Sequence, residues 1–312
     1  MKIVVFGTPQ FAVPCLKHFL TLKDFEVAAV FTQPDRPRGR EKEIIPPPVK
    51  QVALEAGIPV HQPEKIRTPE SEKMLREIAP EAIVIIAYGQ IIPGRLLDIP
   101  RLGWINLHAS LLPKYRGAAP IQWAIANGET KTGVTTMRID AGMDTGDIVL
   151  QEEMDIGGKE TTPDVAAKLS AAGALLMEKT LSGLWDGSLK PRAQDHAKAT
   201  MAPVLKKEDG RIDWNWTAAE IFNRQRAFTP WPGIFTTFRR QSCQLQGVPS
   251  EQLRHGLQAG SIVLDGKNLS VVCGGGTLLS VLYVKLEGRR QVPGQEFGNG
   301  ARIAVGERFG EL

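Results

Sequence analysis

The chain has 312 residues, with 38 Lys and Arg against 34 Asp and Glu and a net charge of +4. At roughly one domain per ~150 residues, this length predicts two domains. We expect a cytoplasmic protein, because no apolar run approaches the ~18 residues of a membrane span and residues 3–6 are too short a run for a signal peptide. The three cysteines lie far apart without a Cys-x-x-Cys pair, which disfavours a disulfide framework and a zinc knuckle.

The positive charge is unevenly distributed along the chain. Residues 206–312 carry 14 Lys and Arg against 10 Asp and Glu, so the two signs balance in residues 1–205. A small excess of this kind usually marks a solvated face. A surface that binds a polyanion is the alternative interpretation.

Short, continuous apolar runs alternate with helical stretches in the first part of the chain. The pattern predicts strands at 2–6, 27–31, 82–87 and 104–107, with helices at 49–56 and 70–79. Continuous apolarity is typical of strands that are covered on both faces, so we predict an α/β domain with a mostly parallel sheet.

The turn Gly7-Thr8-Pro9 predicts a helix that begins there, with Thr8 as the N-cap and Pro9 in the first helical position. A Gly-x-Gly-x-x-Gly motif is absent from this turn, and Pro9 has no N–H to bind phosphate. The turn therefore does not predict a dinucleotide cofactor.

Residues 33–48 are long for a loop between a strand and a helix, which usually has ~2 to 6 residues. Arg36, Arg38 and Arg40 alternate within it. The pattern fits a solvated surface loop, and it equally fits an arginine-bearing loop that closes over a phosphate-rich substrate.

The pattern changes towards the C-terminus. A helix is predicted from Thr162 towards Trp185, and residues 187–203 have the weak periodicity of a linker. A helix at 218–227 is followed by short strand candidates broken by Gly-rich turns, at 234–238, 261–264, 269–273 and 278–284. These features predict a small β-barrel or a β-sandwich.

Asn106 and His108 are the strongest candidates for a functional site. They lie two residues apart in a predicted strand, so they share one face, at the strand end where ligands bind to open α/β sheets. Asp144, in the Gly-punctuated loop 140–147, is the carboxylate candidate. A histidine kept charged by a carboxylate, together with an Asn amide, can stabilise an oxyanion. A capped loop with a core histidine is the plain structural alternative.

Other chemistries find less support. The loop 140–147 lacks the Asp-x-Asx-x-Asx-Gly spacing of a calcium loop, so we expect no metal. Neither a Gly-x-Ser-x-Gly elbow nor a cysteine dyad is present. If the reaction is an acyl transfer, we therefore expect the attacking group on the substrate.

Residues 106–121, NLHASLLPKYRGAAPI, resemble the signature of the 10-formyltetrahydrofolate-dependent formyltransferases, as does the downstream loop 140–147. The resemblance extends over nearly the whole chain to members that act on an aminoacylated tRNA, through residues 31–37, 84–89, 211–214 and 226–232. It implies an N-terminal Rossmann-like domain (1–186), a linker (187–205) and a smaller C-terminal OB-like β-barrel that binds tRNA (206–312).

The same resemblance implies an activity and a role for each site residue. The formyl group of 10-formyltetrahydrofolate would pass to the α-amine of methionine on initiator tRNA, for translation initiation. Asn106 and His108 would polarise the formyl oxygen and stabilise the tetrahedral intermediate, while Asp144 would keep His108 charged and help to move protons. We expect a monomer that binds no membrane.

Two further sets of residues follow from the resemblance. The folate would be contacted by Ser110, Leu111, Leu112, Pro113, Ala87, Tyr88, Gly89, Gln90, Ile91, Ile92 and Asp140. The tRNA would be contacted by Arg36, Arg38, Arg40, Lys42, Lys206 and Lys207. The sequence Glu41-Lys42-Glu43 departs from the more basic, glycine-containing loop of the family, and its acids weaken the attraction of that loop for RNA.

Other functions remain as alternatives. A related formyltransferase would use a small amine, such as glycinamide ribonucleotide or an amino sugar nucleotide, and a formyl-folate hydrolase would use water. A non-catalytic RNA-binding protein that retains the fold belongs to a different class. The presence of Asn106, His108 and Asp144 together argues against it.

Overall fold

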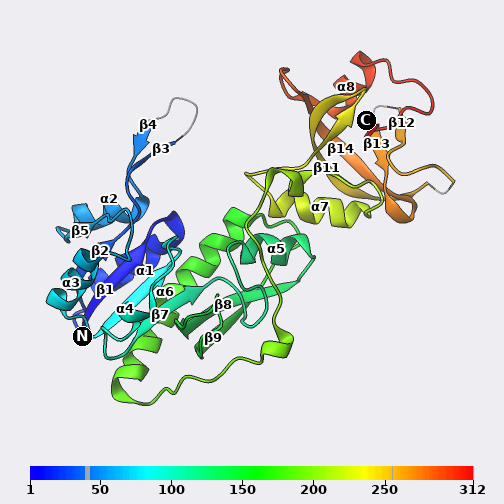
Figure 1. Ribbon diagram of the computed structural model, residues 1–312. Helices are drawn as coiled ribbons and strands as arrows, with labels where there is room; N and C mark the ends of the chain where they lie inside the picture. Colours follow the sequence, from blue (N-terminus) through cyan, green and yellow to red (C-terminus); the bar gives the residue numbers. More distant parts are fainter. Residues whose placement is uncertain (39–42, 255, 267, 312) are drawn as a thin grey trace. The chain divides into compact units, whose positions relative to one another are not determined.

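The computed structural model describes residues 1–38, 43–254, 256–266 and 268–311. The chain forms two compact units (Figure 1). The first contains Met1–Pro120, Lys131–Asp155 and Asp164–Pro203, and the second contains Ile121–Thr130, Ile156–Pro163 and the chain from Val204 onward. No helix in these described ranges is both long and apolar enough to cross a membrane.

A seven-stranded sheet forms the centre of the first unit, in the order β5-β2-β1-β6-β7-β8-β9. The strands are β1 (Lys2–Gly7), β2 (Glu26–Phe31), β5 (Val60–His61), β6 (Ala82–Ile86), β7 (Trp104–His108), β8 (Lys131–Arg138) and β9 (Ile148–Asp155). The first five strands in this order are parallel to one another, whereas β8 is antiparallel to both β7 and β9. The predicted mostly parallel α/β fold is confirmed.

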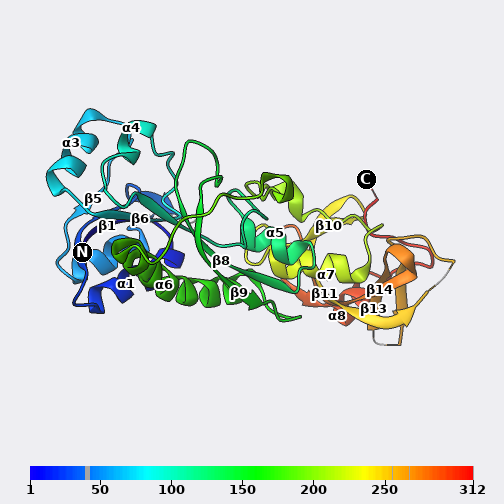
Figure 2. The same cartoon turned by 90° about the horizontal axis from the view of Figure 1, so that it is seen from below.

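Helices cover both faces of this sheet (Figure 2), with α1 and α6 on one side and α3 and α4 on the other. A core of apolar side chains lies between the sheet and the α3/α4 layer, and it includes Phe6, Leu75, Ile83, Leu96 and Trp104. The helices of this unit are α1 (Val13–Thr21), α2 (Pro48–Glu55), α3 (Pro69–Ile78), α4 (Gly94–Leu97), α6 (Thr162–Asp186) and the short 3-10 helices η1 (Gln10–Ala12) and η2 (His196–Lys198).

The predicted helix start at Thr8 is wrong. Pro9 precedes the 3-10 helix η1, and the α-helix begins only at Val13. The Thr8 hydroxyl does not cap a helix but donates to the backbone carbonyl of Tyr88 at 3.1 Å. Thr8 therefore ties the end of β1 to the segment that follows β6.

Residues 33–48 contain more regular structure than the expected loop. Strand β3 (Arg36–Arg38) pairs with β4 (Glu43–Ile45) in an antiparallel hairpin. Asp35 anchors the base of this hairpin, because its carboxylate accepts from Lys50 at 2.6 Å and from Gln62 at 2.8 Å. These hydrogen bonds lower the pKa of Asp35, with Lys50 as the largest cause.

The second unit is built on an antiparallel sheet in the order β10-β11-β14-β13-β12, with β15 paired to β14. The elements are α5 (Pro120–Ala126), η3 (Lys207–Gly210), α7 (Ala218–Ala227), β10 (Phe235–Phe238), β11 (Gln241–Leu253), β12 (Ile262–Asp265), β13 (Asn268–Val272), η4 (Gly274–Gly276), β14 (Thr277–Leu286), β15 (Val292–Pro293) and α8 (Gly294–Gly300). The sequence analysis did not predict β11. Buried Cys243 and Leu245 alternate with exposed polar residues, but Gly247 and Pro249, which are uncommon in strands, interrupt the pattern.

The last residues of the chain close this sheet. Phe309 bridges to Phe238 at the β10 edge, and Arg308 bridges to Ser261 beside the β12 edge. The two edges are therefore joined through one short segment, and Phe309 contributes to the core inside. Of the two predicted architectures, the barrel is the one that forms.

Candidate active site

Strand β7 positions the two central candidates. Leu107 packs against α6, since a Cβ added at Gly173 of that helix would lie 2.5 Å from its side chain. Trp104 faces the opposite layer and donates its indole N–H to the carbonyl of Leu96 in α4. Because strand residues alternate, Asn106 and His108 lie on the Trp104 face, as predicted. The Asn106 side chain is half-buried and makes no hydrogen bond with any residue that the structure describes.

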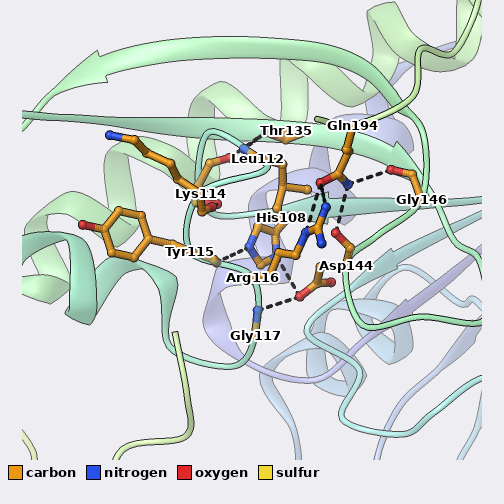
Figure 3. Close-up of polar contacts among 11 residues, drawn as sticks. His108, Leu112, Lys114, Tyr115, Arg116, Gly117, Thr135, Asp144, Gly146 and Gln194 are labelled. Carbon is orange, nitrogen blue, oxygen red and sulfur yellow. Dashed lines mark hydrogen bonds and ion pairs between the residues drawn. The ribbon is translucent and has the colours of Figure 1, made fainter. Parts of the chain in front are cut away.

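His108 is buried, and its two ring nitrogens face different groups (Figure 3). Nε2 lies 2.9 Å from the backbone carbonyl of Tyr115, which can only accept, so Nε2 carries a proton. Nδ1 lies 3.7 Å from Oδ2 of Asp144. The ring therefore presents an N–H to the carboxylate only when it is charged.

The Asp144 carboxylate is held by the backbone of the segment that follows β7. Its Oδ2 accepts from the N–H of Gly117 at 2.8 Å. Gly117 has a φ of 119°, and a Cβ there would lie 2.6 Å from the carbonyl oxygen of Ala202, so no other residue fits this position without a shift. The structure thus brings the predicted carboxylate to the predicted histidine.

Hydrogen bonds between residues of the loop 140–147 stabilise its conformation. Asp140 accepts from the N–H of Gly142 at 3.0 Å and from the hydroxyl of Thr145 at 2.7 Å. Asp144 itself has a φ of 52°, which an L-residue other than glycine rarely adopts. Such a backbone conformation persists only where surrounding contacts fix it.

The segment 187–203, predicted as a linker, runs beside residues 115–117. The N–H of Arg116 donates to the carbonyl of Thr200 at 2.8 Å, and the N–H of Ala202 donates back to the carbonyl of Arg116 at 2.7 Å. The hydroxyl of Thr200 also accepts from the N–H of Tyr115. These hydrogen bonds fasten the segment to residues 115–117, which in turn contact His108 and Asp144.

Two buried residues of the site had no sequence signal. The Arg116 guanidinium donates to Oε1 of Gln194, and the Gln194 amide donates to the carbonyls of Asp144 and Gly146. Arg116 lies within residues 106–121, which carry the family resemblance, but no periodicity around it predicted that its guanidinium would be buried. Gln194 lies in a stretch without periodicity, and a lone glutamine has no pattern of its own.

Of the residues expected to contact folate, Asp140 follows β8, and all the others lie at two neighbouring strand ends, because β6 and β7 pair in parallel. Residues 110–113 follow β7, and the hydroxyl of the buried Ser110 donates to the carbonyl of Lys114. Residues 87–92 follow β6, with Ile91 exposed and Tyr88 buried. The Tyr88 hydroxyl has no hydrogen-bond partner within the described ranges, and burial raises the pKa of this side chain.

The residues expected to contact tRNA are spread over both units. Arg36 is exposed in β3 and Arg38 ends that strand, whereas Arg40 and Lys42 lie outside the described residues. In the second unit, Lys206 and Lys207 are exposed at the start of η3. Within the described part of the chain, no group of three or more His, Cys, Asp or Glu side chains gathers in a way that could hold a metal ion.

Both halves of the chain match models of one protein family. Residues 1–181 match the model described as formyl transferase, and residues 204–302 match the model of the formyl transferase C-terminal domain. The chain belongs to the formyl transferase family.

Relatives that match over the full length carry a narrower name. The methionyl-tRNA formyltransferase of Solibacter usitatus is 50% identical over 311 residues, covering 100% of this chain and 99% of its own. The methionyl-tRNA formyltransferase of Acidobacterium capsulatum is 49% identical over 311 residues, covering 99% of this chain and 100% of its own.

Solved structures share the fold at lower identity. WlaRD, a sugar 3N-formyl transferase studied in the presence of dTDP and 5-N-formyl-THF, has a TM-score of 0.67 and 21% identity, covering 93% of this chain and 99% of its own. An N-formyltransferase from Helicobacter canadensis, in complex with folinic acid and dTDP-3-aminofucose, has a TM-score of 0.66 and 20% identity, covering 90% of this chain and 98% of its own.

Proposed function

We propose that this protein transfers the formyl group of 10-formyltetrahydrofolate to the α-amine of methionine on initiator tRNA. The observation that carries the proposal is the similarity to two relatives named methionyl-tRNA formyltransferase. They are 50% and 49% identical to this chain over 311 residues, which include both units. These relatives match over 99% to 100% of this chain, so the resemblance includes the second unit as well as the catalytic domain. We place the reaction in the cytoplasm, where translation begins.

In this proposal, Nδ1 of His108 is the ring nitrogen that meets the formyl oxygen. Nε2 is already committed to the carbonyl of Tyr115. The 3.7 Å between Nδ1 and Asp144 is too long for a hydrogen bond, so the N–H of the charged ring can donate to a substrate oxygen instead. Asn106, on the same face, adds an amide donor that no other described residue engages.

The proton balance gives Asp144 its role. The amine nitrogen attacks the formyl carbon, the electrons of the C=O bond move onto the oxygen, and the bond from carbon to N10 of the folate breaks as the intermediate collapses. The amine loses one proton and N10 gains one, so no net proton is consumed. The Asp144 carboxylate is partly exposed beside His108, and we assign it to accept the amine proton and pass it on.

The binding surfaces follow the same proposal. The pterin would lie along residues 87–92, 110–113 and Asp140, next to the formyl-binding residues. The 33–48 hairpin and the second unit, with Lys206 and Lys207, would hold the tRNA. The domain borders expected from the sequence, with catalysis in 1–186 and tRNA binding in 206–312, belong to this proposal.

A formylation assay tests the acceptor directly. Purified protein and 10-formyltetrahydrofolate are incubated with initiator Met-tRNA, elongator Met-tRNA or a small amine, and the formylated product is measured. We expect rapid formylation of initiator Met-tRNA and little of the small amine. Efficient formylation of the small amine without formylation of Met-tRNA would refute the proposed acceptor while retaining the chemistry.

A further inference from the structure

Gln194 connects the C-terminal side of the catalytic domain to the loop that carries Asp144. Its Nε2 donates to the backbone carbonyl of Asp144 at 2.9 Å and to that of Gly146 at 2.7 Å (Figure 3). One amide therefore spans the two carbonyls that flank Thr145. The side chain reaches the loop from the stretch after α6, about fifty positions further along the sequence.

The orientation of this amide is determined by Arg116. Oε1 of Gln194 accepts from Nε of Arg116 at 3.1 Å and from Nη2 at 2.6 Å. A guanidinium has only donors, so the amide oxygen must face it and the amide nitrogen must face the loop. Both side chains are 6% exposed, so water does not compete for these bonds.

Arg116 is itself fixed by backbone and side-chain contacts. Its N–H and carbonyl pair with Thr200 and Ala202, and its Nη2 lies 3.1 Å from Nδ1 of His196. The guanidinium of Arg116 therefore orients the amide of Gln194, and this amide holds the loop 140–147 through two backbone carbonyls. Among the described residues, no hydrogen bond or ion pair joins Arg116, Gln194 or His196 to His108.

The loop requires such a restraint at Asp144. Its φ of 52° is unfavourable for an aspartate, and the carboxylate must still reach the N–H of Gly117 and the ring of His108. Gly146 is packed so closely that an added Cβ would overlap the carbonyl oxygen of Arg138. Gln194 bonds the backbone on both sides of Thr145, so it fixes the point from which the Asp144 side chain projects.

We propose that Gln194 is a positioning residue for formyl transfer, which sets the Asp144 carboxylate against Nδ1 of His108 by bonding the carbonyls of Asp144 and Gly146. This inference rests on the proposed function. It goes further in assigning a role in catalysis to a buried glutamine that touches no reacting atom.

Two variants of similar size separate positioning from packing. Gln194→Met removes both N–H donors of the amide. Gln194→Glu removes them as well, and it places one carboxylate oxygen against the two backbone carbonyls while the other oxygen pairs with Arg116. We expect each variant to lower kcat by about 10- to 100-fold, with the KM for either substrate changed less than about threefold. The new ion pair should keep the Tm of Gln194→Glu near that of the wild type. If the role were only structural, activity would follow Tm, and that result would overturn the proposal.

A double-mutant cycle tests whether Gln194 acts through Asp144. In single-turnover assays, Gln194→Met combined with Asp144→Asn should be as slow as Asp144→Asn alone, within about twofold. If the two effects multiply instead, Gln194 acts by another route and the proposal fails. Lys190→Ala is the control, because this exposed side chain lies in the same segment and makes no hydrogen bond or ion pair with the described residues. It should leave kcat within about twofold of the wild type.

Hydrogen exchange gives a readout that does not depend on activity. The backbone amides of 140–147 and of Gly117 should exchange faster in Gln194→Met than in the wild type and in Lys190→Ala. Unchanged exchange together with unchanged kcat would overturn the positioning role. Absence of formyl transfer by the wild-type protein would instead refute the proposed function, so the two failures are distinguishable.

Discussion

Asn106 differs from the polar residues around it, because its amide has no partner among the described residues, whereas His108, Arg116 and Gln194 are all hydrogen-bonded. Its amide atoms remain accessible for a hydrogen bond, since they are not among the described side-chain atoms that are fully buried without a partner. A substrate oxygen in the site can supply that bond, and it does so best when it carries negative charge. This contrast makes Asn106 the residue whose contribution to catalysis is easiest to isolate.

Replacing Asn106 with Ala should lower kcat by about 100- to 1000-fold, because loss of one oxyanion donor has an effect of that size in acyl transfer. The KM for Met-tRNA should change little, since the donor acts on charge that develops in the transition state. Steady-state kinetics measure both quantities. Asn299→Ala, an exposed position of α8, is the control. A large rise in KM with kcat unchanged would show that Asn106 binds substrate without stabilising the intermediate.

At the scale of elements, the 33–48 hairpin is anchored at its base. Asp35 bonds Lys50 in α2 and Gln62 after β5, so the anchor reaches two neighbouring elements of the first unit. Arg36, one residue further on, is exposed and lies 4.0 Å from Glu64. An arginine that is free to rearrange on a strand with a fixed base suits a contact with phosphate.

This anchor should make stability depend on pH. The pKa of Asp35 is lower in the folded protein than in the unfolded chain, so its contribution is present above about pH 4 and is lost as the pH falls through the folded value. Asp35→Asn should lower Tm at pH 7 by no more than about 4 °C, because the pair is partly exposed.

Calorimetry of wild type and Asp35→Asn between pH 7 and pH 3 measures this effect. The difference in Tm should shrink below about pH 4. Asp98→Asn, at an exposed carboxylate that ends α4, controls for a change in charge alone. A difference that stays constant over the whole range would show that the lowered pKa of Asp35 does not stabilise the fold.

At the scale of the whole molecule, the excess of positive charge lies in residues 206–312, which form most of the second unit. The first unit holds the residues proposed for catalysis. The three cysteines are free and buried, Cys15 in the first unit and Cys243 and Cys273 in the second, and burial raises the pKa of each thiol. No disulfide therefore joins the unit proposed for catalysis to the unit proposed for tRNA binding.

Binding of tRNA should weaken steeply with salt, because each neutralised phosphate releases counterions. Three phosphate contacts alone would lower affinity by about 15- to 40-fold between 50 and 200 mM salt. The double variant Lys206→Glu/Lys207→Glu should reduce this slope, measured by filter binding of Met-tRNA. Lys17→Glu/Lys23→Glu makes the same change in net charge at exposed positions of the first unit and serves as the control. Affinity that is independent of salt would contradict a phosphate-binding surface.

The sequence by itself determined the local structure and the identity of the central residues. Periodicity located four strands of the first sheet and the helix α6, because side-chain burial repeats with the backbone geometry. The alternation along β7 placed Asn106 and His108 on one face before any contact was known. The local pattern placed the start of α1 too early, because a 3-10 helix precedes it. It also missed β11, in which Gly247 and Pro249 interrupt the alternation.

Only the tertiary structure decided how the site is held together. Arg116 and Gln194 are 78 residues apart, and Gly117 and Asp144 are 27 apart, so neither contact leaves a trace in periodicity. The closure of the barrel by Phe309 depends in the same way on a pairing between distant residues. Local patterns report which side of an element is buried, whereas the partner of a buried polar group depends on how distant segments pack.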